Sequence, residues 1–356
     1  MTSLSVSVAM ATYNGAFYLA EQLADIANQT HLPAELVVCD DGSTDDTLAT
    51  LKRFAASAPF AVHIHTNPER LGYRANFLKC ASLCRSDLIA FCDQDDRWHP
   101  DKIQTMLACF ADPDVLLAFH GAEVVTHDER SLGHLASTPR PAGPTRPLGG
   151  SPWTFALGFT QVFRRWLSDC DGWWGLSRDH NSADEPLAHD QWYFFLASVL
   201  GTIVNVDAPL ARYRQHDANV FGSKKGQRKG LARLRYRARS AESSTKCRAL
   251  AATQRALILD LAAGSLGSPY GQRARDGAIA FRRLAALSAR RAAIYAGTGV
   301  LDRARAFAGL VSARGYGSNP WRFGMLALAM DLSVGLPGIA RARSRKDADA
   351  AGVATP

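Results

Sequence analysis

The first 120 residues alternate short apolar runs with amphipathic stretches. The apolar runs have the length of buried strands and cover residues 4–11, 35–39, 60–65, 87–92 and 115–119. The stretches between them space their apolar residues as helices do, over residues 17–29, 44–56, 73–85 and 100–110. Such alternation predicts an α/β fold, in which a mostly parallel sheet is sandwiched by helices. Because ligands bind at the carboxyl ends of such strands, the loops 12–15, 40–46 and 93–97 form the candidate site.

Two of these loops concentrate carboxylates directly after predicted strands. In Asp-Asp-Gly-Ser-Thr-Asp-Asp at 40–46, Ser43 or Thr44 can cap the next helix, but capping does not explain the first two aspartates. Asp-Gln-Asp-Asp at 93–96 places three carboxylates at the sheet edge, where their repulsion is costly unless a cation neutralises it. A hard ion such as Mg²⁺ or Mn²⁺ takes carboxylate, water and phosphate oxygens, so the cluster suits a metal that carries a diphosphate. The alternative is a solvated turn that precedes the next helix.

Composition narrows the class of protein. The chain has 356 residues, of which 47% are hydrophobic, as expected for one large globular domain with an appendage or for two domains. Its seven cysteines are scattered singly, and no basic stretch precedes the N-terminal apolar run, so we expect a cytoplasmic protein without a signal peptide. Neither a glycine-rich dinucleotide signature nor a P-loop follows the first strand, which removes the main support for dinucleotide oxidoreductases and P-loop enzymes.

Six short motifs between residues 4 and 222 resemble, in their order, the inverting glycosyltransferase family 2, which has the GT-A fold. They are Ala-Thr-Tyr-Asn-Gly at 11–15, Asp-Asp-Gly-Ser-Thr-Asp at 40–45, the segment 67–76, Cys-Asp-Gln-Asp-Asp-Arg-Trp at 92–98, His-Asp-Gln at 189–191 and Tyr-Arg-Gln-His-Asp-Ala-Asn at 213–219. The motifs at 92–98 and 213–219 are most similar to those of bacterial rhamnosyltransferase-type members, which act in polysaccharide assembly. The resemblance implies transfer of a sugar from a nucleotide diphosphate sugar donor to a saccharide or lipid-linked acceptor.

The resemblance also implies roles for individual residues. The donor pocket would contain Thr12, Tyr13, Asn14, Asp40, Gly72, Asn76, Asp93 and Gln94. Within it, Asp40 would hydrogen-bond the pyrimidine base and Asp93 would face the ribose or the sugar. Asp95 would hold the Mg²⁺ or Mn²⁺ ion that bridges the two phosphates, and His216 would contact the metal or the diphosphate from the far side.

Inverting transfer needs a base that takes the proton of the acceptor hydroxyl as nucleoside diphosphate leaves. Asp190 matches the base of the family, and the apolar, aromatic run after it predicts a buried helix with Asp190 in its first turn. The structural alternative is an N-cap, which is worth about 1 kcal/mol. The family often has Glu-Asp here, whereas this chain has His189-Asp190, so the first carboxylate is absent. His189 would bind the acceptor or pack inside the protein.

The acceptor side is less well defined. Residues 128–152 are rich in Pro and Gly, which indicates a long connection or a flap. Residues 153–166 correspond to the acceptor-facing segment of the family, although Gly158-Phe-Thr-Gln161 matches its usual pattern only loosely. For Trp173, Trp174 and Trp192, stacking on sugar rings and packing in the core both remain open.

The net charge of +8 is distributed unevenly along the chain. Residues 1–211 carry 14 Lys and Arg against 25 Asp and Glu, whereas residues 212–356 carry 27 against 8. The family resemblance ends near residue 222, and together with the charge distribution it predicts a glycosyltransferase domain at 1–222 and a basic, mainly helical region at 223–356, with amphipathic helices over 253–263 and 277–296. The apolar stretch 323–339 contains Asp331 and Pro337, and it falls short of a transmembrane helix.

The basic region leaves several partners to consider. It could lie on an anionic membrane, which would make the enzyme peripheral on the inner membrane face, or it could form a solvated helical bundle. Nucleic acid is not expected, because few aromatic residues accompany the basic ones and no nucleic-acid-binding motif is present. A non-catalytic carbohydrate- or nucleotide-binding relative of the fold is a further alternative, and the joint presence of Asp95, Asp190 and His216 argues against it.

Overall fold

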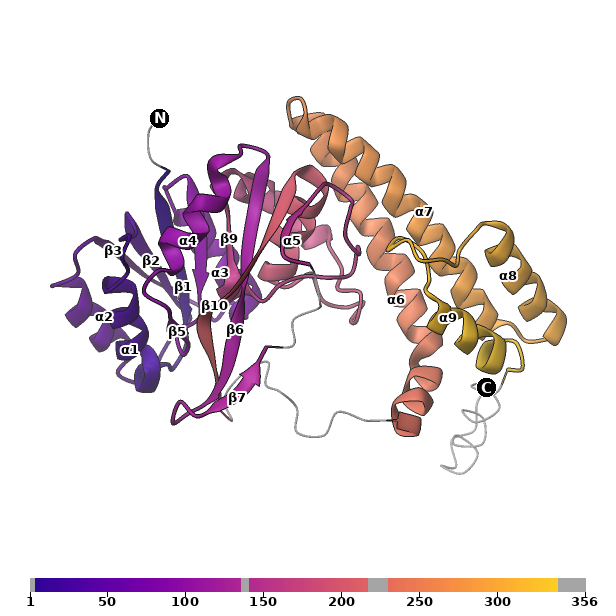
Figure 1. Ribbon diagram of the computed structural model, residues 1–356, viewed down its shortest axis with the longest axis horizontal. Helices are drawn as coiled ribbons and strands as arrows, with labels where there is room; N and C mark the ends of the chain where they lie inside the picture. Colours follow the sequence, from indigo (N-terminus) through magenta and orange to yellow (C-terminus); the bar gives the residue numbers. More distant parts are fainter. Residues whose placement is uncertain (1–3, 136–140, 217–229, 339–356) are drawn as a thin grey trace. The chain divides into compact units, whose positions relative to one another are not determined.

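The chain forms two compact units, shown as a ribbon in Figure 1. The computed structural model describes residues 4–135, 141–216 and 230–338, with the backbone alone for 230–239. The first unit comprises Met1–Gly150, Thr154–Trp174 and Leu187–Ser223. The second comprises Ser151–Trp153, Gly175–Pro186 and Lys224–Pro356. The predicted boundary at 222/223 lies outside the described residues and stays a prediction, but two short segments before it group with the second unit.

The first unit is built on one ten-stranded sheet (Figure 1). Its strands are β1 (Val6–Thr12), β2 (Glu35–Asp40), β3 (Ala61–Thr66), β4 (Leu88–Cys92), β5 (Arg97–Trp98), β6 (Val115–Thr126), β7 (Ser131–His134), β8 (Gly143–Thr145), β9 (Gln161–Arg164) and β10 (Thr202–Gln215). The order is β3-β2-β1-β4-β9-β6-β10-β5, with β7 beside β6 and β8 beside β10. Pairing is parallel from β3 to β4 and between β6 and β10, whereas β9 and β5 are antiparallel to their neighbours. The predicted α/β fold is confirmed, and the parallel half carries the candidate loops.

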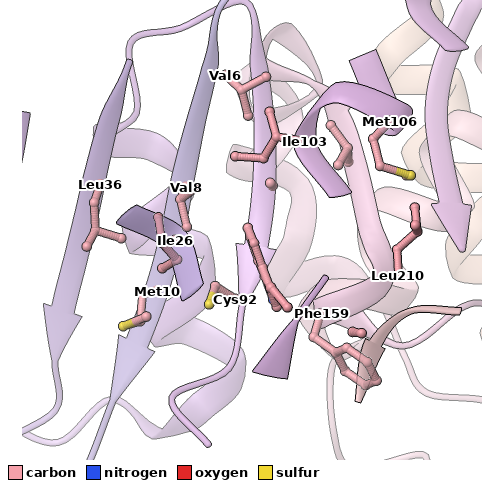
Figure 2. Close-up of a cluster of buried hydrophobic side chains, with 14 of the residues drawn as sticks. Val6, Val8, Met10, Ile26, Leu36, Cys92, Ile103, Met106, Phe159 and Leu210 are labelled. Carbon is pink, nitrogen blue, oxygen red and sulfur yellow. The ribbon is translucent and has the colours of Figure 1, made fainter. Parts of the chain in front are cut away.

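Helices cover both faces of this sheet. They are α1 (Ala16–Ala27), α2 (Thr47–Ala55), α3 (Gly72–Leu83), α4 (Lys102–Ala108) and α5 (His189–Leu200), with the 3-10 segments η1 (Cys109–Ala111), η2 (Gly158–Thr160) and η3 (Arg165–Leu176). Side chains alternate across a strand, so Val8 and Met10 of β1 and Leu36 of β2 all face the same layer of helices. There they pack with Ile26 of α1 and Ile103 of α4 in the main core (Figure 2).

The opposite face of the sheet carries α3 and α5. Phe77 of α3 contacts Phe91 of β4 with ring centroids 5.2 Å apart, and Tyr193 of α5 stacks on Phe163 of β9 at 4.2 Å. Nearly every residue of α5 is buried, from His189 onward. Because close packing leaves such a helix little freedom to shift, the position of its first turn is set by the core.

The second unit is helical. Its helices are α6 (Gly230–Ser265), α7 (Tyr270–Ala296), α8 (Val300–Ser312) and α9 (Met325–Met330), followed by a π-helical turn, η4 (Asp331–Gly335). Helices α6 and α7 run side by side (Figure 1), and the predicted helices at 253–263 and 277–296 lie within them. Arg255 of α6 is buried, donates to the Pro152 carbonyl and lies 5.1 Å from the Trp153 ring centroid, which explains why 151–153 belong to this unit. Among the described residues, no helix is both long and apolar enough to cross a bilayer.

Candidate active site

The loops after β1 and β4 meet at the carboxyl ends of adjacent parallel strands. The Tyr13 N–H donates to Gln94 Oε1 at 2.9 Å, and Gln94 Nε2 donates back to the Tyr13 carbonyl at 3.1 Å. The Asn14 N–H donates to Ser43 Oγ at 2.9 Å, which ties in the loop after β2. Tyr13 is 37% exposed, and the Arg70 guanidinium lies 3.8 Å from the centroid of its ring. The structure thus brings Tyr13, Asn14 and Gln94 together around an exposed aromatic ring.

Asp40 lies beneath this surface. Its fully buried carboxylate accepts hydrogen bonds from Thr12 Oγ1 at 2.8 Å, from the Gly42 N–H at 3.2 Å and from the N–H and Oγ of Ser43 at 2.9 and 2.5 Å. These four donors occupy the lone-pair positions of the carboxylate. Asp40 and Thr12 therefore organise the loop around Gly42, whose φ is +83°. Contact between Asp40 and a base stays a prediction, and it requires one of these hydrogen bonds to be exchanged.

The start of α2 differs from the prediction. The expected cap from Ser43 or Thr44 is wrong, because Ser43 bonds to Asp40 and the helix begins later, at Thr47. The Thr47 N–H and hydroxyl donate instead to Asp45 Oδ1 at 3.0 and 2.5 Å. This tight local turn, together with the bonds to Asp40, holds the loop after β2 in place.

A second buried network underlies the donor side, and its centre, Asp41, carried no predicted role. The Asp41 carboxylate accepts from Asn67 Nδ2 at 2.9 Å, from the Leu71 N–H at 2.7 Å and from the Gly72 N–H at 2.8 Å. Gly72 has a φ of +75°, which glycine adopts without strain, and it starts α3. Asn76 accepts from Asn67 at 2.8 Å and donates to the carbonyl at the end of β2 at 2.8 Å. The structure thus places Gly72 and Asn76 in the scaffold beneath the candidate donor loops.

The acidic cluster follows β4, and β10 brings His216 to it. Antiparallel pairing of β5 with β10 places the end of β10 beside the cluster, and the Arg214 N–H donates to Asp96 Oδ1 at 3.2 Å. Two residues further on, His216 Nε2 lies 2.9 Å from Asp95 Oδ2. Both side chains are partly exposed, and the His216 ring stacks on Tyr18 with centroids 4.8 Å apart. The two residues predicted to hold a metal therefore meet, although 121 positions separate them.

Asp95 and His216 fit a divalent cation that takes its other ligands from phosphate and water. Within the described ranges, no group of three or more His, Cys, Asp or Glu side chains is arranged to hold a metal alone. A small protein ligand set is typical of Mg²⁺ sites that also use substrate phosphates. Burial, followed by the negative charges of Asp95 and Asp190, raises the pKa of Asp93 to about 8. Negative charge is therefore in excess here, and a bound cation would offset it.

Asp190 lies in the first turn of α5, close enough to Asp93 for their charges to interact. Its carboxylate is buried, and Oδ1 accepts from the Gln191 N–H at 2.8 Å. Burial raises the pKa of Asp190 to about 7, although hydrogen bonds from the backbone of Gln191 and Gly158 and the charge of Arg74 lower it. A carboxylate with a pKa near 7 is well matched to general-base catalysis at neutral pH.

His189 packs in the core. Its ring stacks on Phe77 with centroids 4.0 Å apart and meets Phe91 edge-on at 4.9 Å. Its Nε2 lies where a side chain at Gly158 would come within 2.5 Å, so glycine is needed there. Burial, and then the charge of Arg74, lower the pKa of His189 to about 3, so the ring is neutral at pH 7. Of the two predicted roles for His189, the structure supports packing.

The three candidate tryptophans differ in burial. Trp192 is completely buried and donates through Nε1 to Asp171 Oδ1 at 2.8 Å, so stacking of Trp192 on a sugar ring is wrong. Trp174 Nε1 donates to the Leu187 carbonyl at 2.8 Å, just before α5. Trp173 is half-buried, and its role stays open.

The sequence profile of the glycosyl transferase family 2 matches residues 7–171, which include the loops after β1, β2 and β4 and the acidic cluster. Residues 7–171 form a glycosyl transferase family 2 domain. The predicted resemblance to family 2 is therefore confirmed for these residues.

Two sequence relatives and one solved structure are similar to more of this chain than residues 7–171. An uncharacterized glycosyltransferase of Nostoc sp. is 25% identical over 228 residues, which cover 61% of this chain and 66% of the relative. The dTDP-rhamnosyl transferase RfbG of Shigella flexneri is 26% identical over 245 residues, which cover 64% of this chain and 80% of RfbG. The structure of S. aureus TarS 1-349 in complex with UDP matches 81% of this chain and 92% of that chain, with a TM-score of 0.51 and 17% identity. This structural likeness concerns the fold, and it confirms the GT-A prediction.

The family 2 domain also contains a buried cation, Lys102, which the sequence reasoning missed. Lys102 is fully buried, donates to the Phe159 carbonyl at 2.7 Å and lies 3.4 Å from the Trp98 ring centroid. Burial lowers the pKa of Lys102 to about 7, while the nearby acidic groups, among them Asp96 and Asp93, raise it. Lysine is rarely buried without a partner. The position of Lys102 in a predicted helix did not indicate that its side chain would lie near the acidic cluster. Lys102 thus links the acidic cluster to the segment that leads towards Asp190.

We expect Lys102→Met to lower the free energy of unfolding by about 1–3 kcal/mol, the usual cost of leaving a buried polar group, here the Phe159 carbonyl, without its hydrogen-bond partner. Methionine keeps the apolar stem but neither donates to the Phe159 carbonyl nor offsets the charge of Asp96. Urea denaturation followed by circular dichroism measures the loss. Lys52→Met, at an exposed position on α2, is the control and should stay within about 0.5 kcal/mol. A loss for Lys102→Met as small as that of the control would contradict this role.

Proposed function

We propose that this protein transfers a sugar from a nucleotide diphosphate sugar to a hydroxyl acceptor, with inversion at the anomeric carbon. The observation that carries the proposal is the placement of a buried carboxylate with a pKa near 7, Asp190, close to the acidic cluster that contains the Asp95–His216 pair. The acidic cluster lies at a strand end within the residues that match family 2, where ligands of such sheets bind, whereas Asp190 and His216 lie beyond the matched residues.

In this proposal, the donor lies across the loops after β1 and β4. The base stacks on the exposed ring of Tyr13, beside Arg70, and Gln94 fixes the loop that carries Tyr13. Asp95 and His216, which lie 2.9 Å apart, would hold Mg²⁺ or Mn²⁺, and Asp93 would face the ribose or the sugar. When bound, the metal stabilises the negative charge that develops on the leaving diphosphate.

Asp190 acts as the general base. The acceptor hydroxyl gives its proton to the Asp190 carboxylate, its oxygen forms the new bond to the anomeric carbon, and the bond from that carbon to the diphosphate oxygen breaks. A single displacement of this kind inverts the anomeric configuration. The neutral, packed ring of His189 has a pKa too low to serve as the group that titrates near pH 7.

The acceptor and the cellular setting are further parts of the proposal. The name of RfbG supports dTDP-rhamnose as the first donor to test, and assembly of a bacterial cell-surface polysaccharide or a lipid-linked glycan as the setting. A saccharide or lipid-linked acceptor would place the enzyme in the cytoplasm and, through its basic region, on the inner face of an anionic membrane.

A thermal-shift screen of nucleotide sugars, with and without Mn²⁺, tests the donor assignment. We expect at least one dTDP- or UDP-linked sugar to raise the melting temperature in the presence of Mn²⁺ and much less without it. If no nucleotide sugar changes the melting temperature, or if Mn²⁺ makes no difference to those that do, the proposed donor site is contradicted.

The pH dependence of kcat/KM tests the base. Asp190 acts only when deprotonated, so kcat/KM should fall about tenfold per pH unit below a pKa near 7 and level off above it. Arg74→Met removes a positive charge that lowers the pKa of Asp190, so it should move this limb to higher pH. Arg70→Met, which removes the cation beside Tyr13, is the control and should leave the limb in place. A flat profile between about pH 5.5 and 8 would contradict the assignment.

A further inference from the structure

The outward face of α9 and η4 carries large apolar side chains and one hydroxyl, that of Ser333, but no charge, although it belongs to a basic unit. Met325, Leu326 and Leu332 are 69%, 55% and 47% exposed, and Ala329 is exposed as well. Their spacing of i, i+1, i+4 and i+7 places them on one side of a helical segment. Helices that face water normally carry polar or charged residues on that side, so this face is unusual for a solvated helix.

The single charge in this segment points inward. Asp331 is the only charged residue between 323 and 338, and its side chain is completely buried. It accepts hydrogen bonds from Arg291 Nε at 2.9 Å, from Tyr316 OH at 2.6 Å and from Tyr295 OH. Because Arg291 neutralises Asp331 inside the unit, the outward face of α9 and η4 keeps no charge.

The sequence directly after this face is strongly basic. Residues 341–346 read Arg-Ala-Arg-Ser-Arg-Lys. Residues 240–338 themselves carry 13 Lys and Arg against 5 Asp and Glu. An apolar helical face combined with a cluster of four or more basic residues matches the two signals that together hold a protein on an anionic membrane. A second copy of this chain would instead bring two basic surfaces together, which charge repulsion disfavours.

We propose that the face formed by Met325, Leu326, Ala329 and Leu332 inserts into the interface of an anionic lipid bilayer, to which the excess of basic residues in 240–338 attracts this unit. This inference extends the membrane partner of the proposed function by naming the element that inserts. The glycosyl transfer chemistry does not depend on it. The inward ion pair of Asp331 with Arg291 keeps the only charge of the segment away from the lipid.

Co-sedimentation of the full-length protein with vesicles of phosphatidylglycerol and phosphatidylcholine tests the proposal. We expect the double variant Met325→Asp and Leu326→Asp to bind at least tenfold more weakly than the unaltered protein at about 0.1 M salt. Leu257→Asp is the matched control, because Leu257 is 45% exposed on α6 of the same unit, and its binding should not change. Circular dichroism and thermal melting show that each variant is folded.

Three other results of these experiments would each overturn the proposal for a different reason. If the unaltered protein ignores the vesicles at low salt, the membrane partner itself is wrong and this inference falls with it. If the double variant binds as well as the unaltered protein and about 0.5 M salt releases both, the basic residues act alone and the apolar face has no part in binding. If light scattering shows a dimer that the double variant dissociates, the face is an interface between copies and the proposal is overturned.

Discussion

Asp190→Asn is expected to lower the rate of sugar transfer by about a hundredfold to ten-thousandfold, which is the usual contribution of a general base. The N-cap of α5 is Ala188, so the alternative that Asp190 is the N-cap is wrong. The amide has nearly the same size and still accepts the hydrogen bond from the Gln191 N–H, so a residue that only stabilises the first turn of α5 would tolerate the change. A base would not, because the amide cannot take the acceptor proton. Initial rates of nucleoside diphosphate release at pH 8 measure the effect.

Stability and donor binding separate this outcome from misfolding. Burial raises the pKa of Asp190 above that of an unfolded aspartate, so its contribution to stability is complete at low pH and is lost as pH rises through about 7. The melting temperature of Asp190→Asn at pH 8 should therefore be no lower than that of the unaltered protein, and donor affinity should be nearly the same. Asp184→Asn, at an exposed carboxylate, is the control. If Asp190→Asn keeps activity within severalfold and Asp184→Asn loses it, the base is Asp184 instead.

Asp95→Ala is expected to abolish the metal-dependent part of nucleoside diphosphate binding. Loss of groups that only orient metal ligands typically costs about 10–100-fold in metal affinity, so loss of a ligand should cost at least as much. His216→Ala should act in the same direction, because His216 Nε2 lies 2.9 Å from the Asp95 carboxylate. Titration calorimetry of dTDP and UDP, with and without Mn²⁺, measures the loss.

The control for this series is Asp207→Ala, which removes an exposed carboxylate from β10 without touching the acidic cluster. It should bind the diphosphate as the unaltered protein does. Equal affinity of Asp95→Ala and the unaltered protein, unaffected by Mn²⁺, would show that Asp95 does not hold a metal and would leave the acidic cluster without its proposed use.

The strand ends of the donor half could be predicted from the sequence because the pattern there is local. Each strand is short and apolar, and polar residues follow it at once, so the loops after β1, β2 and β4 could be assigned to one edge of the sheet. The antiparallel insertion of β9 between β4 and β6 could not be predicted, because the order of strands in the sheet depends on contacts between distant segments. The length of α6 was also missed, since its basic first part shows no single apolar stripe.

Some features of the candidate site could likewise be predicted from the sequence and others could not. The meeting of Asp95 with His216 depends on the antiparallel pairing of β5 with β10, and only the family resemblance indicated it. The burial of Asp40 and the buried cation Lys102 were not predictable, because residue type alone places both at the surface. For Asp41, the sequence showed only that helix capping does not explain its carboxylate.

The most direct test of inverting sugar transfer is to follow the anomeric configuration of the sugar during turnover. Proton nuclear magnetic resonance can monitor a dTDP- or UDP-linked sugar incubated with the protein and Mn²⁺, with water or an added saccharide as acceptor. We expect the first sugar product to have the configuration opposite to that of the donor, and Asp190→Asn and Asp95→Ala to form it far more slowly. A product that retains the donor configuration, or turnover that is equal in these variants, would contradict the account.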